Sequence, residues 1–133
     1  MTWKKDLKFG QQYELIALKY LDFKEYTLNI DYRYDLLLDN KIKIEVKADR
    51  LAHKTNNLAI EFECFDKPSG IYISEADYYI YFIVKPNNEY TVYKIKTDDL
   101  KEKIKDCIIV RGGDMKASKM YLLNLDKMKD FKI

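Results

Sequence analysis

Apolar residues near the start of the chain recur at steps of three and four, the spacing of one face of an α-helix. The repeat comprises Trp3, Leu7, Gly10, Ala17, Leu18 and Leu21. No proline interrupts residues 4–23. We therefore expect a helix over residues 4–23 with one side packed against the rest of the fold.

The pattern changes to a period of two after this helix, which is typical of half-buried β-strands. Alternation predicts strands over residues 26–34, 35–38 and 41–48, and Asp39 and Asn40 are residues that favour a turn between the last two. This pair of strands is a predicted hairpin.

Similar apolar segments predict later strands over residues 58–65, 78–84, 90–96, 107–110 and 119–125. A polar connection is expected around residues 53–57, a short helical turn at 74–77, a helix at 97–105 and a short helix at the end of the chain. A helix followed by mostly antiparallel strands predicts an α/β fold of the mixed α+β type, in one domain spanning residues 1–133.

Length and composition agree with such a domain. The chain has 133 residues, of which 47% are hydrophobic and 35% are charged, and a chain of this length buries enough surface for a core. Its longest apolar run, residues 78–84, is far shorter than the roughly 20 residues that span a bilayer. The first residues lack the apolar segment of a secretory leader. We expect a cytoplasmic protein without membrane contact, in the host cytoplasm if a phage encodes it.

The charge and the reactive side chains of the sequence limit which ligands and which catalytic mechanisms are available to the chain. The net charge is only +2, and three arginines stand among 24 basic residues, so any nucleic acid would be bound through its backbone rather than by reading of bases. Two separated cysteines and the single His53 cannot supply a thiolate zinc site, and they argue against Ser-His or Cys-His catalysis. Carboxylates and lysines remain as candidate catalytic groups.

The predicted hairpin brings two acids and a lysine together. Glu45 and Lys47 are two apart on a strand and therefore share a face. A hairpin in which Leu38 pairs with Ile42 keeps the apolar residues of both strands on one face, and it places Asp35 opposite Glu45 on the other. Opposed carboxylates about 5 Å apart can share a divalent cation.

Glu14 is a further candidate because it falls within the apolar stripe of the first helix. An ionised carboxylate on a packed face is unfavourable unless a cation or hydrogen-bond donors satisfy it. Glu14 is either one of many helical acids at the edge of the stripe or a group directed at the site of Asp35 and Glu45.

These residues carry a family resemblance. The set comprises Asp35, Glu45-Val46-Lys47 and the upstream Gly10-x-x-x-Glu14. It resembles the PD-(D/E)XK nuclease superfamily, and within it the archaeal Holliday-junction resolvases and small phage endonucleases, most firmly over residues 8–80. Tyr34 stands where the name-giving proline would be, and the helix expected after the Glu-x-Lys strand is not evident.

The resemblance implies a restriction-endonuclease-like fold, with an N-terminal helix on a central mixed sheet and an αβββαβ-type core followed by extra strands. It implies a Mg²⁺-dependent endonuclease, with Mn²⁺ as a substitute, that hydrolyses DNA phosphodiester bonds as a homodimer, with branched junctions as candidate substrates. Asp35, Glu45, Glu14 and the Val46 carbonyl would hold metal, and Lys47 would position or deprotonate the attacking water.

Other readings stay open. A non-catalytic nucleic-acid-binding module could retain the same fold, and a protein-interaction domain could carry these acids on its surface. Candidate DNA-contacting residues are Arg50, Lys54, Lys67 and Ser69, although exposed lysines often serve solubility alone. Glu61 and Glu63 could either extend the acidic face or lie in solvent.

Overall fold

The computed structural model describes residues 3–29 and 33–133. It begins with α1 (Trp3–Ala17), which continues into a 3-10 turn, η1 (Leu18–Tyr20). The predicted helix is present but ends earlier, since residues 21–23 are not helical, and its buried face centres on Tyr13 and Ala17 rather than on Gly10. The contributions predicted for the Trp3 and Leu7 side chains lie outside what the structure describes, because only the backbone is described there.

Five strands form the first sheet: β1 (Tyr26–Leu28), β2 (Leu36–Leu38), β3 (Ile42–Asp49), β6 (Tyr78–Val84) and β7 (Tyr90–Lys96). They lie in this order, and β3 and β6 are parallel while the other neighbours are antiparallel. Leu38 pairs with Ile42 and Leu36 with Ile44, which confirms the predicted hairpin register. The strand predicted over residues 26–34 is shorter, and part of it, residues 30–32, lies outside the described chain.

The second sheet has the order β5-β4-β9-β8. Its strands are β4 (Asn57–Cys64), β5 (Lys67–Pro68), β8 (Ile108–Gly112) and β9 (Ser118–Asn124). Leu58, Ile60 and Phe62 of β4 are buried and alternate with more exposed residues, as the period-two pattern predicted. All pairings in this sheet are antiparallel.

Short helices join these strands. They are α2 (Ala52–Thr55), α3 (Thr97–Lys103) and the 3-10 segments η2 (Gly70–Tyr72), η3 (Ile104–Asp106), η4 (Asp114–Lys116) and η5 (Leu125–Phe131). The polar connection predicted around residues 53–57 contains α2. The helical turn predicted at residues 74–77 is wrong, because the Ser74 hydroxyl accepts from the Ala76 N–H in a tight turn and the helical turn lies earlier, at η2.

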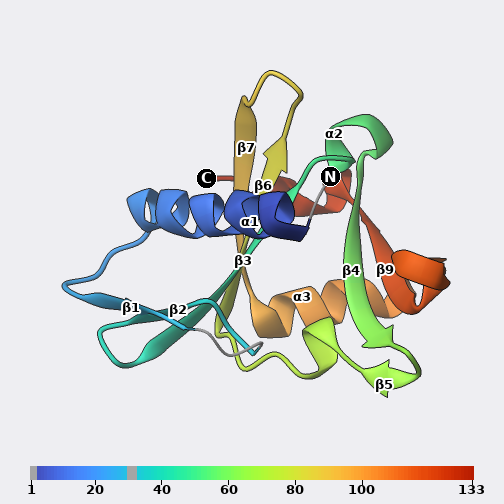
Figure 1. Ribbon diagram of the computed structural model, residues 1–133, viewed down its shortest axis with the longest axis horizontal. Coiled ribbons are helices and arrows are strands. Elements are labelled where there is room, and N and C mark those ends of the chain that lie inside the picture. Colours follow the sequence, from blue (N-terminus) through green and yellow to red (C-terminus); the bar gives the residue numbers. More distant parts are fainter. Residues whose placement is uncertain (1–2, 30–32) are drawn as a thin grey trace.

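The first sheet lies between α1 and the second sheet (Figure 1). On the α1 side, Tyr13 and Ala17 pack against residues such as Ile44, Ile80 and Phe82. On the other side, alternate residues of β6 and β7 pack against β4 and β9 and against Leu100 of α3. The two apolar clusters fix α1, β3 and β4 relative to one another, and these elements carry the candidate site.

The architecture is a mixed α+β fold built from two sheets and a few helices, which agrees with the predicted class. Within the described part of the chain, no helix has the length and apolar character needed to cross a bilayer.

Candidate active site

Glu45 and Lys47 lie on the face of β3 that is turned away from α1. Their neighbours Ile44 and Val46 are buried in the cluster with α1, so the alternation of the strand directs the charged pair to the opposite face. Glu45 is only 8% exposed, whereas Lys47 is exposed. The Lys47 Nζ lies 3.5 Å from the Glu45 Oε1, so the ammonium group of an exposed lysine stands beside a buried acid.

Asp35 lies directly before β2 and continues its pairing with β3. Its N–H donates to the Ile44 carbonyl at 2.9 Å, and its Oδ2 accepts from the Val46 N–H at 2.7 Å. The Asp35 carboxylate therefore accepts a β3 hydrogen bond that the backbone of a neighbouring strand would otherwise accept. Asp35 is held against the backbone of the segment that carries Glu45, as the predicted register requires.

Glu14 reaches the same carboxylate from α1. It is only partly buried, at the edge of the apolar face rather than in its middle as predicted, because Tyr13 occupies the packed position. Burial, the charge of Asp35 and a side-chain hydrogen bond with Asp35 raise the pKa of Glu14 to about 7. The helix thus directs Glu14 toward the hairpin acids.

Glu45 is the second acid in contact with Asp35. Burial raises the pKa of Glu45 to about 8; Lys47 opposes this rise, and the charge of Asp35 with a hydrogen bond to it reinforces the rise. Near pH 7, Glu14 and Glu45 therefore hold protons readily, and Asp35 lies between them. Asp35 therefore has a carboxyl from α1 on one side and a carboxyl from β3 on the other, an arrangement that favours added positive charge.

The donor set suits a hard divalent cation, because such ions take carboxylate and carbonyl oxygens. The protons that Glu14 and Glu45 retain are the charge that a cation would replace. In the structure, however, the side chains do not surround an ion: among the described residues, no group of three or more His, Cys, Asp or Glu side chains is placed to hold a metal ion. The fit lies in donor chemistry and convergence, and the carboxyls would have to separate around an ion.

Two tyrosines complete the surroundings and were not singled out from the sequence. In the parallel pairing of β3 with β6, Tyr79 lies beside Glu45 and Tyr81 beside Lys47, and their rings stack with centroids 5.9 Å apart. Burial raises the pKa of Tyr79 to about 12, while a hydrogen bond with Ser74 acts in the opposite direction. The alternation within residues 78–84 could have indicated these positions only if the parallel partner of β3 had been known.

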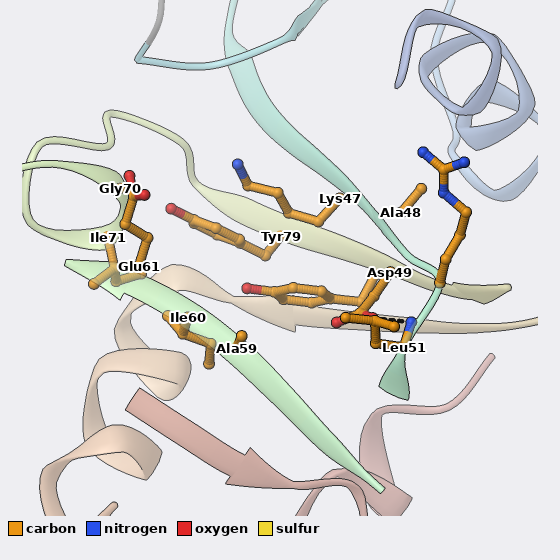
Figure 2. A pocket seen from close by; sticks show the side chains of 12 residues that line it. Lys47, Ala48, Asp49, Leu51, Ala59, Ile60, Glu61, Gly70, Ile71 and Tyr79 are labelled. Carbon is orange, nitrogen blue, oxygen red and sulfur yellow. Dashed lines mark hydrogen bonds between the residues drawn. The ribbon is translucent and has the colours of Figure 1, made fainter. Parts of the chain in front are cut away.

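Two adjoining hollows open beside the acids. One of about 230 Å³ is lined by Glu45, Lys47, Glu61, Ser69 and Tyr79, among others. The next, of about 350 Å³, shares Lys47, Glu61 and Tyr79 and extends along β3 to Arg50. Figure 2 shows the side chains of Lys47, Glu61 and Tyr79 pointing into the same space. A substrate group could therefore approach the acids from between the two sheets.

The four candidate DNA-contacting residues are not all at this site. Ser69 lines the smaller hollow, and its buried hydroxyl has no hydrogen-bond partner among the residues that the structure describes. Arg50 lines the larger one and stacks on Phe9, with its guanidinium carbon 3.8 Å from the ring centroid. Lys54 is exposed on α2, while Lys67 is exposed on β5 and lines neither hollow.

Glu61 and Glu63 have separate surroundings. Glu61 lines both hollows and accepts a hydrogen bond of 2.8 Å from the Ser118 hydroxyl. Glu63, beyond a bulge in β4, pairs with Lys119 at 2.9 Å. Only Glu61 therefore extends the polar lining near Lys47.

A scan against models of known protein families finds no match, and no curated protein matches the sequence at a significant level.

Proposed function

We propose that this chain is a Mg²⁺-dependent endonuclease that hydrolyses DNA phosphodiester bonds. The observation that carries the proposal is the contact of Asp35, directly before β2, with Glu14 of α1 and Glu45 of β3, with Lys47 beside Glu45. Partly buried acids in contact with one another are unfavourable on their own, so their convergence from positions far apart in the sequence supports a ligand of positive charge.

The strand order of the first sheet supports a restriction-endonuclease-like core. A helix is followed by three antiparallel strands, a connection and a strand parallel to the third, which is an αβββαβ order in which the connecting helix is reduced to α2. The second sheet consists of β4 and β5, which follow α2 in the chain, and of the C-terminal strands β8 and β9. In such a core, the hairpin acids lie at the edge of β3 where a phosphate can approach.

Each residue has a role in the proposed chemistry. Asp35, Glu45, Glu14 and the Val46 carbonyl would hold the cation, which when bound supplies Lewis acidity and lowers the pKa of a water ligand. Lys47, exposed and 3.5 Å from Glu45, can orient the attacking water and donate hydrogen bonds to the charged phosphate. Buried Glu45 fixes the position of Lys47 by their charge contact.

One observation favours a second function. The carboxyls bond to one another rather than surrounding an ion-sized space, as they would in a nucleic-acid-binding module that retains the fold without catalysis. Cleavage, rather than binding, separates the two functions. Preference for branched junctions and action as a homodimer, which would place two such sites for paired cuts, belong to the nuclease proposal.

The test is incubation of the purified chain with labelled linear, nicked, single-stranded and four-way-junction DNA, and with RNA, in Mg²⁺ or Mn²⁺. We expect cleavage that EDTA blocks and that Asp35→Ala, Glu45→Ala or Lys47→Ala lowers by about 100-fold or more. Glu63→Ala, which removes an acid outside the site, is the matched control and should cleave normally. Binding without metal-dependent cleavage on every substrate would support the module instead.

A further inference from the structure

A basic hollow lies at the end of β3, away from the acids. It has a volume of about 360 Å³ and opens between α1, the α2 segment and the β6–β7 hairpin. Its lining includes the basic residues Arg50, His53, Lys54 and Lys85, over an apolar base that includes Phe9 and Val84. None of the described residues that line it is acidic; Glu89, in the same hairpin, is exposed and lies outside the lining. Figure 1 shows α2 and the hairpin at one end of the molecule.

Arg50 joins this basic hollow to the candidate active site. Its guanidinium lies on the Phe9 ring at 3.8 Å, a contact that holds a planar cation in a defined orientation. Arg50 also lines the larger hollow, which contains Lys47. The hollow at Glu45 shares Lys47 with the larger hollow, and the larger hollow shares Arg50 with the basic hollow, which lies on the α1 side of the first sheet just beyond the end of β3.

Spacing and charge match a polyanionic chain that passes from the basic hollow around the end of β3, at Arg50, to Lys47 on the other face. At about 3.3 Å per strand residue, Arg50 lies roughly 16 Å along β3 from Glu45, a span of a few nucleotides. Two acids border the path, but both have hydrogen-bond partners. The Asp49 Oδ1 accepts from the Leu51 and Ala52 N–H groups at 2.8 Å each, and Glu61 accepts from Ser118.

We propose that the basic hollow binds backbone phosphates of the strand that the site at Asp35 and Glu45 cleaves, a few nucleotides from the scissile bond. This rests on the proposed nuclease function. Lys54 and Lys85 contact phosphates as point charges, and Arg50 orients the strand between the hollow and Lys47. The recognised chemistry is a nucleic-acid backbone without regard to base sequence.

The test compares two double variants with the same change in charge. Lys54→Glu with Lys85→Glu reverses two exposed lysines of the hollow, and Lys19→Glu with Lys101→Glu reverses two exposed lysines elsewhere. Binding of fluorescent DNA and RNA strands is measured by anisotropy in EDTA over a range of salt, so that cleavage plays no part. Polyglutamate is added as a competing acidic peptide.

We expect the hollow variant to bind at least about tenfold more weakly at low salt, and the slope of log affinity against log salt to fall by about 1.5, since each lost phosphate contact removes about 0.7–0.9. The control should change by less than about threefold. Equal weakening of both variants, or equal competition by polyglutamate, would overturn the basic hollow as a backbone site and leave metal-dependent cleavage unaffected. Absence of nucleic-acid binding by the wild-type chain would also overturn the basic hollow as a backbone site, whereas the nuclease proposal is decided separately by cleavage in Mg²⁺.

Discussion

Replacing Glu45 by glutamine removes a buried charge and keeps the shape of the side chain, so it should stabilise the metal-free protein at high pH. Folding raises the pKa of Glu45 from 4.5 to about 8. A group with a raised pKa contributes its full stability below the unfolded value and loses it as pH rises through the folded value. The wild-type chain should therefore lose stability relative to Glu45→Gln between about pH 4.5 and pH 8.

The size of this loss follows from the shift. One pKa unit corresponds to about 1.4 kcal/mol, so full ionisation of Glu45 could cost about 5 kcal/mol. Solvent in the adjoining hollow, which Glu45 lines, screens part of this cost, and we expect roughly 2 kcal/mol above pH 8. In a chain of this length, that difference would raise the unfolding midpoint of the variant by about 6 °C.

The assay is urea and thermal unfolding of wild type and Glu45→Gln from pH 4 to pH 9 in EDTA, with Glu63→Gln as the control for loss of a partly exposed acid. The Glu45→Gln curves should coincide with wild type near pH 4 and separate above pH 6, while Glu63→Gln stays within about 1 kcal/mol throughout. Mg²⁺ should then stabilise the wild type and leave Glu45→Gln nearly unchanged. A difference that is independent of pH, or a variant less stable at pH 8, would refute the buried-acid reasoning.

Three further changes test other parts of the account. Gly10→Ala should stabilise the chain by about 1 kcal/mol in urea unfolding, because a Cβ at Gly10 meets nothing within 4 Å and glycine disfavours helix; a loss would show that α1 packs differently there. Gly70→Ala should destabilise the chain by at least about 2 kcal/mol, because Gly70 has φ +51° and an added Cβ would clash with the Glu61 carbonyl oxygen. Gly113→Ala is the comparison: its φ is +72° but an added Cβ has more space, so it should cost less in the same unfolding assay. Lys47→Met should lower the turnover of cleaved DNA at least 100-fold and leave strand affinity within about threefold by anisotropy; a parallel loss of affinity would give Lys47 a binding role.

The hairpin was the most predictable part of the fold. Keeping the apolar residues of β2 and β3 on one face allowed only one register, and that register alone set Asp35 opposite Glu45. The direct bond from the Val46 N–H to the Asp35 carboxylate was not predictable, since it depends on where β2 ends.

Other features depend on contacts distant in sequence. Tyr13, which the helical pattern did not single out, takes the packed position next to Glu14 because its ring packs against Phe82 and Tyr90. The separation of β4 from the first sheet followed from its pairing with β9, about 60 residues later, which no local pattern indicates. Tyr79 and Tyr81 joined the site through the parallel β3–β6 pairing, and long-range parallel pairings leave little local signal in a sequence.

The most direct test of the central claim is the position at which Mn²⁺ binds. In NMR spectra of the labelled chain titrated with Mn²⁺, paramagnetic broadening should begin at the amides of Glu14, Asp35 and Glu45, and Asp35→Asn should abolish it at the same metal concentration. Broadening that begins elsewhere, or that survives Asp35→Asn unchanged, would contradict a metal-dependent centre formed by these carboxylates.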